Sequence, residues 1–292
     1  MSTPSKSRPA LGRIGIWSGE IRFADAGRRA EAAAELEELG YGTIWFPGGI
    51  GGDITADIDA LLAATRRATI GTGILNIWRH EPKDVGAWWR GLPEGQKGRV
   101  MLGLGVSHQL LIGADYGKPL MVMTRYLDGL DAEGVPAESR CLAALAPRML
   151  DLSRDRSAGT HPYLVTPEHS RVCRDRVGPD AIVAPEQGVV LESDPALARE
   201  MARKAVGFYT KLPNYVNNWL RLGFTQEDVD TLSDRLIDGL FAWGDAAAVK
   251  ARVDQHLAAG ADHVCLQVIA PSGDEGWPYL RDAWRELAKA LI

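Results

Sequence analysis

The stretch RVMLGLGVSH, from Arg99 to His108, holds the residue types that point most directly to chemistry. An apolar run leads into Gly103 and Gly105 and then directly into Ser107 and His108. A continuous apolar run is typical of a strand buried on both faces, and a glycine near its end lets a ligand approach the backbone. Polar residues after such a strand lie where α/β enzymes keep their chemistry. We therefore expect a ligand beside these glycines, and proton transfer by His108, because imidazole titrates near neutral pH.

The elements that must position these residues alternate along the whole chain. Short apolar or β-branched runs predict eight strands, at residues 11–17, 43–47, 70–75, 100–106, 141–145, 161–165, 181–192 and 263–269. Helical patterns fill the gaps, at residues 25–39, 57–67, 83–92, 120–133, 147–156, 167–176, 195–209, 246–259 and 279–291. This alternation predicts an α/β protein with a (β/α)8 TIM barrel. An open doubly wound sheet is disfavoured, because no G-x-G-x-x-G follows an early strand.

The predicted barrel forms a single domain over residues 11–292. Residues 1–10 are polar and rich in Pro and Ser, which is typical of a flexible N-terminal tail. The longest irregular segment, at about residues 211–243, is an insertion between the seventh and eighth strands. Such an insertion often shapes the substrate pocket or a subunit contact, and additional packing on the side of the barrel is the alternative.

Composition excludes several classes of protein. The 292 residues are 46% hydrophobic and 24% charged, as in an ordinary globular protein, and the net charge of −5 argues against nucleic-acid binding. No apolar stretch approaches the roughly 20 residues of a membrane span, and the first ten residues lack the apolar core of a secretory signal. Three dispersed cysteines fit a reducing compartment. We expect a cytoplasmic protein with a small-molecule substrate and neither nucleic-acid nor membrane partners.

The residues after the predicted strands are rich in glycine, aromatic and amide groups and poor in carboxylates. A metal-dependent barrel would place several Asp or Glu residues or an H-x-H pair there, and a Schiff-base enzyme would place a Lys there. Because these are missing, no metal site is expected. The remaining groups fit a slot for a flat, largely apolar ring with an anionic tail. Backbone amides at the glycines and at the start of the helix at Pro147 would hold a phosphate.

Four segments carry a resemblance to a known family. They read GTGILNIWRHEP at residues 71–82, GRVMLGLGVSH at 98–108, LAALAPRMLDLSRDRSAGTHPYLVTPEH at 142–169 and APEQGVVL at 184–191. Together they resemble the bacterial luciferase-like superfamily and, more narrowly, its actinobacterial oxidoreductases that use the deazaflavin coenzyme F420. The resemblance extends from about residue 11 to residue 291. It implies a TIM barrel that binds coenzyme F420 or FMN in its mouth, and a homodimer formed through barrel helices.

Carried over residue by residue, the resemblance also implies site positions. A non-prolyl cis peptide between Gly73 and Ile74 would lie at a bulge of the third strand, behind the cofactor ring. Asn76 would contact the pyrimidine edge of that ring. The other implied cofactor-binding residues are Gly105, Val106 and Ser107 along the ring, and Ala144, Leu145, Ala146 and Arg148 at the phosphate and acidic tail.

One departure from the family limits what is carried over. Relatives that oxidise sugar phosphates with coenzyme F420 have an Asp-His pair after the second strand and a Glu after the fourth, where this chain has Gly48, Gly49 and His108. For acid–base catalysis we expect His108 first, followed by His161 and Glu186. The resemblance implies F420-dependent hydride transfer to or from a small organic substrate. An FMN-dependent flavin monooxygenase and a non-catalytic flavin- or ligand-binding barrel are the alternatives.

Overall fold

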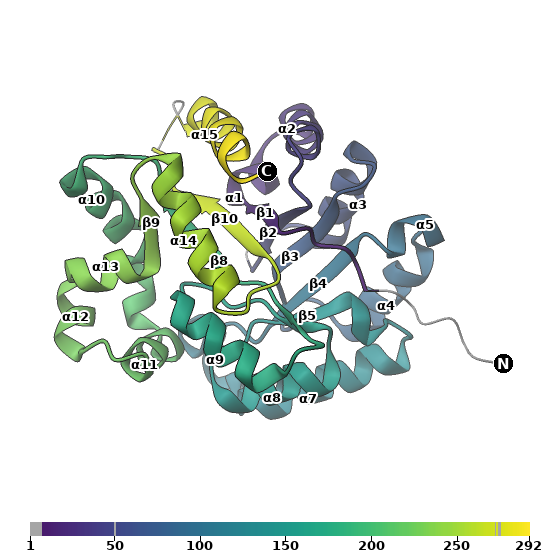
Figure 1. Ribbon diagram of the computed structural model, residues 1–292. Helices are drawn as coiled ribbons and strands as arrows, with labels where there is room; N and C mark the ends of the chain where they lie inside the picture. The colour runs from purple at the N-terminus through teal and green to yellow at the C-terminus, as the bar shows by residue number, and fades with distance from the viewer. Residues whose placement is uncertain (1–7, 50, 272, 274–275) are drawn as a thin grey trace.

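The computed structural model describes residues 8–49, 51–271, 273 and 276–292. Parallel strands form one sheet in the order β7-β6-β5-β4-β3-β2-β1-β10-β8-β9, and helices cover its outer face (Figure 1). The strands are β1 (Ile14–Trp17), β2 (Thr43–Gly48), β3 (Thr69–Asn76), β4 (Val100–Gly105), β5 (Arg140–Leu142), β6 (Gly159–Thr160), β7 (Ile182–Val183), β8 (Glu186–Val190), β9 (Phe241–Trp243) and β10 (Val264–Val268). Of the tail predicted over residues 1–10, residues 1–7 lie outside the described part.

The predicted seventh strand is one segment of chain that closes the sheet. Its first part, β7, pairs with β6, and its second part, β8, pairs with β10. Pro185 lies between the two parts, and a proline has no N–H to donate to a neighbouring strand. Because β7 and β8 occupy a single position and β9 is an additional strand paired with β8, eight strand positions close into a ring, and the predicted (β/α)8 barrel is confirmed.

The sixth strand is shorter than predicted and lies earlier in the chain. It covers Gly159–Thr160 and not residues 161–165. Gly159 has a φ of +154°, and a Cβ atom built on it would lie 2.1 Å from the backbone oxygen of Ile182. This close approach fixes the strand at Gly159, and Pro162, which lacks an N–H, follows soon after it. His161 and Tyr163 therefore lie beyond the end of β6, at the mouth of the barrel.

The helices around the barrel begin and end close to the predicted positions. They are α2 (Ala26–Glu38), α3 (Ile54–Ala64), α4 (Pro82–Gly91), α7 (Pro119–Ala132), α8 (Pro147–Arg156), α9 (Pro167–Val177), α10 (Pro195–Val206), α14 (Ala246–Ala258) and α15 (Gly276–Leu291). Five of them begin with a proline, at a position where no N–H is needed. In the described part of the chain, no helix combines the length and the apolar character that crossing a membrane requires.

The insertion predicted at residues 211–243 contains three helices and an unpredicted strand. After η3 (Gly207–Lys211) come α11 (Pro213–Arg221), α12 (Gln226–Thr231), α13 (Asp234–Leu240) and the strand β9. β9 pairs with β8, where Phe241 fills the space left by Gly188, since a Cβ atom on Gly188 would lie 2.6 Å from its ring. With α10, these helices surround the buried Trp219 and form a group on one side of the barrel (Figure 1).

Aromatic and imidazole rings fill the inside of the barrel. Trp45 stacks on His161, with ring centroids 4.2 Å apart and 8° between the ring planes. Trp45 Nε1–H donates to His263 Nε2 at 3.1 Å, and His263 Nδ1–H donates to the Gly12 oxygen at 2.8 Å. Gly71 provides the space for Trp45, because a Cβ atom there would lie 2.4 Å from the indole. These rings form a fixed layer directly beneath the mouth. The three cysteines are buried free thiols.

Candidate active site

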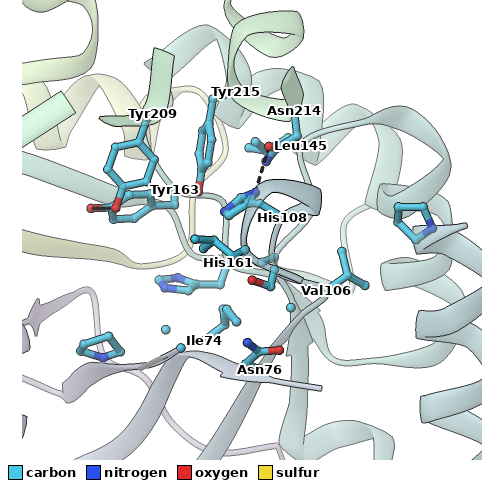
Figure 2. Close-up of a pocket in the computed structure, with 18 of the residues that line it drawn as sticks. Ile74, Asn76, Val106, His108, Leu145, His161, Tyr163, Tyr209, Asn214 and Tyr215 are labelled. Atoms are coloured by element: carbon cyan, nitrogen blue, oxygen red, sulfur yellow. Dashed lines mark hydrogen bonds between the residues drawn. The ribbon is translucent and has the colours of Figure 1, made fainter. Parts of the chain in front are cut away.

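A cavity of about 630 Å³ opens where the barrel strands end. Most of its lining comes from the ends of β1 to β6 and from η3 and α11. Figure 2 shows Ile74 and Asn76 on one side, Tyr209, Asn214 and Tyr215 on the opposite side, and His108 between them. Barrels of this architecture hold their active sites at this end, and the volume suits a small-molecule ligand. We call one surface of the cavity the floor; it consists of Gly73, Ile74, Asn76, Gly105 and Val106. We call the opposite surface the roof; it consists of Tyr209, Asn214, Tyr215, Asn217 and Arg221.

The floor is built by an irregularity in the pairing of β3 with β4. The peptide bond between Gly73 and Ile74 is cis, as the resemblance implies. The register between β3 and β4 shifts between Gly71 and Leu75, which identifies a bulge. A Cβ atom on Gly105 would lie 2.6 Å from Ile74 Cδ1. Gly105 therefore makes room for the Ile74 side chain, which forms part of the apolar surface that faces the cavity.

Asn76 supplies a polar group at the edge of this apolar floor. It is the last residue of β3, and its side chain is buried. Its Oδ1 atom accepts the Trp78 N–H at 3.0 Å, which leaves the side-chain NH2 as the end available to a ligand. A buried amide NH2 requires an acceptor. The carbonyl edge of a heterocyclic ring would supply one.

His161 lies beside the floor in the cavity lining, and its tautomer is fixed. The residue is 2% exposed, and its Nδ1–H donates to the Ala184 oxygen at 2.7 Å. Nε2 therefore carries the lone pair, and this buried atom has no partner among the described residues. A Cβ atom on Gly73 would lie 2.9 Å from it. Burial lowers the pKa of His161 to about 4, so the ring is neutral at pH 7. It packs against Trp45 as a neutral imidazole.

His108 lies between the floor and the roof, at the start of α6 (Gln109–Ile112). Its Nδ1 atom is 3.1 Å from Asn214 Oδ1, an acceptor, so Nδ1 carries the proton and Nε2 the lone pair. Its ring packs against Tyr215, with centroids 5.6 Å apart. Burial lowers the pKa of His108 below its usual value of 6.5. At pH 7 the side chain is a neutral base that lines the cavity.

Glu186 is buried behind the cavity lining. It begins β8, is 1% exposed, and its Oε2 atom accepts the Leu164 N–H at 3.1 Å. Its other oxygen is buried without a partner in the described part of the chain. Burial raises the pKa of Glu186 to about 8, so the group is a neutral acid at pH 7. It is not among the residues that line the cavity.

The structure brings most of the predicted site residues together. Ten of them line the cavity, namely Gly73, Ile74, Asn76, Gly105, Val106, Ser107, His108, Leu145, Ala146 and His161. Three do not: besides Glu186, Ala144 is buried behind the lining and Arg148 is exposed on α8. The described residues include no group of three or more His, Cys, Asp or Glu side chains placed to hold a metal ion.

The roof was not predicted residue by residue. It consists of Tyr209 from η3 and of Asn214, Tyr215, Asn217 and Arg221 from α11, so the insertion does shape the pocket. The spacing of Asn214, Asn217 and Arg221, at i, i+3 and i+7, puts them on one face of a helix, and this was the available signal. Tyr209 and Tyr215 lie 5.0 Å apart between ring centroids, and Tyr163 lies 5.5 Å from Tyr209. These three tyrosines form a continuous aromatic wall.

Comparisons with known proteins agree with this architecture. Residues 2–132 match the family model described as luciferase-like monooxygenase, and no curated protein sequence matches the chain. A similar solved structure is an F420-dependent secondary alcohol dehydrogenase in complex with an F420-acetone adduct, with 14% identity and a TM-score of 0.74 over 97% of this chain and 100% of that one. Another is the coenzyme F420-dependent tetrahydromethanopterin reductase from Methanopyrus kandleri, with 15% identity and a TM-score of 0.71 over the same shares.

A third similar structure is a type II Baeyer-Villiger monooxygenase, the oxygenating constituent of 3,6-diketocamphane monooxygenase from Pseudomonas putida in complex with FMN. It has 10% identity and a TM-score of 0.64 over 97% of this chain and 99% of that one. At such identities these likenesses concern the fold. The resemblance of this chain to the luciferase-like superfamily is confirmed by the family model over residues 2–132, and the solved structures confirm the fold over nearly the whole chain.

Proposed function

We propose that this protein is a luciferase-like oxidoreductase that binds coenzyme F420 in the cavity and supports hydride transfer to or from a small organic substrate. The observation that carries the proposal is the construction of the cavity, in which an apolar floor with one amide at its edge faces an aromatic roof. The two F420-dependent enzymes of this fold also have higher TM-scores than the FMN-dependent monooxygenase. Bound coenzyme F420 supplies the carbon that accepts or donates the hydride.

The residues of the floor fit a flat heterocycle with carbonyl groups on one edge. Ile74 and Val106 offer apolar surface to the face of a ring. The NH2 of Asn76, which needs an acceptor, is placed to donate to a ring carbonyl. Leu145 and Ala146 line the cavity beside the start of α8, whose first free N–H groups suit an anionic oxygen of the tail.

The protein's own part in the reaction is to orient the substrate and to move one proton. His108 is neutral, and its Nε2 lone pair is free because Nδ1–H donates to Asn214. In the oxidative direction Nε2 takes the proton of a substrate hydroxyl group, and in the reductive direction the same atom returns it. The tyrosine wall of Tyr163, Tyr209 and Tyr215 keeps water away from the reacting groups.

A fluorescence titration of the purified protein with coenzyme F420 and, separately, with FMN tests the proposal. We expect saturable binding of coenzyme F420 with a Kd at least about tenfold below that for FMN, a difference of about 1.4 kcal/mol. Tight binding of FMN alone would contradict the assignment of coenzyme F420 and favour a flavin monooxygenase. Binding of neither compound by a folded sample would favour a non-catalytic barrel.

A further inference from the structure

The roof carries a row of polar side chains along one face of α11. Asn214, Asn217 and Arg221 all line the cavity, at successive positions of that face. Asn214 is hydrogen-bonded to His108, the base of the proposed reaction. Arg221 is the last residue of the helix. Seven residues of α-helix correspond to a rise of about 10 Å, so the row extends from the reacting end of the cavity to a second, distinct end.

The second end of the cavity is positively charged. Among the described residues that line the cavity, Arg221 is the only one charged at pH 7, since His108 and His161 are neutral. Its Nη2–H donates to Asn218 Oδ1 at 3.2 Å, and Asn218 is 1% exposed, so a buried amide orients the guanidinium group. Arg221 forms no ion pair within the part of the chain that the structure describes. A guanidinium group that lines a cavity without a carboxylate partner is suited to an anionic ligand.

The surface between the two ends is aromatic. Tyr209 and Tyr215 pack nearly perpendicular to each other, with 85° between their ring planes, and Tyr163 extends the wall towards Trp17 at 5.8 Å. Rings in contact at these distances leave no space between them, so they present one surface to the cavity. Such a surface favours a flat or alicyclic apolar body over a chain of polar groups.

We infer that the roof recognises an organic acid as substrate: an aromatic or alicyclic body packs against the tyrosine wall, and Arg221 and Asn217 bind its carboxylate. Along α11, Arg221 lies about 10 Å from Asn214, the hydrogen-bond partner of His108. The identity of the reacting end rests on the proposed function, whereas the anion site at Arg221 does not. The anionic tail of a cofactor shares the chemistry of a carboxylate, and the experiment separates the two sources.

Calorimetric titration of the cofactor-free protein with 4-phenylbutyrate and with its uncharged amide, 4-phenylbutyramide, measures the preference for an anion. We expect the wild-type protein to bind the carboxylate about tenfold more tightly than the amide. R221M should abolish that preference and leave the affinity for the amide unchanged. K211M is the matched control, because Lys211 is an exposed cation at the end of η3 that does not line the cavity, and it should retain the preference.

Titration of the same proteins with coenzyme F420 distinguishes the two sources of the anion. If Arg221 binds the substrate, R221M keeps the Kd for coenzyme F420 within about twofold of the wild-type value. If R221M weakens coenzyme F420 tenfold and leaves the preference for the carboxylate intact, Arg221 serves the cofactor tail and the inference is wrong. A wild-type protein that binds carboxylate and amide equally also overturns it. Failure of both cofactors to bind refutes the proposed function, while a carboxylate preference lost in R221M still supports the anion site.

Discussion

His108 and His161 both contribute to the site as neutral imidazoles, but their free nitrogens face different surroundings. Nε2 of His161 is buried beneath Gly73, where no solvent reaches it, and burial lowers the pKa of this ring to about 4. His108 Nε2, by contrast, is not among the buried atoms without a partner, and it belongs to a residue that lines the cavity beside the roof. We therefore propose that His108 transfers the proton and that His161 packs beside the floor.

Replacing His108 by Ala should lower kcat by about 100-fold or more and change the Kd for the cofactor by less than about threefold, because a general base acts mainly on the transition state. Burial lowers the pKa of His108, so its basic form persists below pH 6.5, and oxidative turnover should fall only as the pH drops through the lowered pKa. Steady-state kinetics across pH 5 to 8 measures both effects. His80→Ala is the control, since His80 does not line the cavity. Turnover unchanged in His108→Ala would exclude its acid–base role.

Within the sheet, glycines allow β3 and β4 to approach each other closely beneath the floor. A Cβ atom on Gly103 would lie 2.0 Å from the backbone oxygen of Thr72, and backbone cannot rotate away as a side chain can. Thr72 Oγ1 in turn donates to the Gly103 oxygen at 2.9 Å. The glycine in the middle of β4 therefore belongs to barrel packing, while Gly105 at its end accommodates Ile74.

Gly103→Ala should lower the free energy of unfolding by about 1–3 kcal/mol, the usual cost of overpacking a core. Gly98→Ala, just before the same strand, is the matched control. A Cβ atom there meets nothing within 4 Å, and its φ of −69° suits alanine, so stability should stay the same or rise by about 0.5 kcal/mol. Urea unfolding followed by circular dichroism compares the two variants. Equal losses in both would mean that the contact with Thr72 does not limit this position.

The sequence predicted those elements whose signal is local. Continuous apolar runs marked the strand positions, and prolines marked the starts of α4, α8, α9 and α10. What it could not predict depends on contacts between distant segments. β9 has three residues and pairs with β8 where Gly188 leaves space for Phe241, and β6 begins earlier than predicted, where Gly159 closely approaches Ile182. The floor was predictable because strand ends converge in a barrel, whereas most of the roof belongs to α11 in the insertion, whose position follows from no general rule of the barrel fold.

At the scale of the whole molecule, the histidines form a set of neutral groups. Burial lowers the pKa of each of the six. His256 shows how one is accommodated. Gln187 donates through Nε2 to the Leu240 oxygen, so its Oε1 accepts from His256 Nε2–H at 3.0 Å. Ser170 must then donate to His256 Nδ1 at 2.8 Å. A second proton on such a ring would displace a hydrogen bond inside the protein, which links the fold to pH.

The free energy of unfolding should therefore fall steeply as the pH is lowered from 6.5 to 5. The four most deeply buried histidines, His161, His169, His256 and His263, have pKa values of about 3 to 4 in the folded protein against 6.5 for an unburied imidazole. In this window the unfolded chain binds protons that the folded protein does not, and each group removes up to about 1.4 kcal/mol per pH unit.

Glu186 opposes this trend. Its pKa is raised to about 8, so the folded protein holds a proton that the unfolded chain releases above about pH 4.5, and the contribution of Glu186 to stability grows as the pH falls. Because four histidines lower the stability towards acid and only Glu186 raises it, the free energy of unfolding still falls as the pH is lowered. Urea unfolding at pH 7, 6 and 5 measures it, and Glu186→Gln, which removes the opposing group, should steepen the loss by up to about 1.4 kcal/mol per pH unit. A free energy of unfolding that stays constant from pH 7 to 5, in both the wild-type protein and Glu186→Gln, would contradict this prediction. It would mean that the buried histidines do not have lowered pKa values in the folded protein.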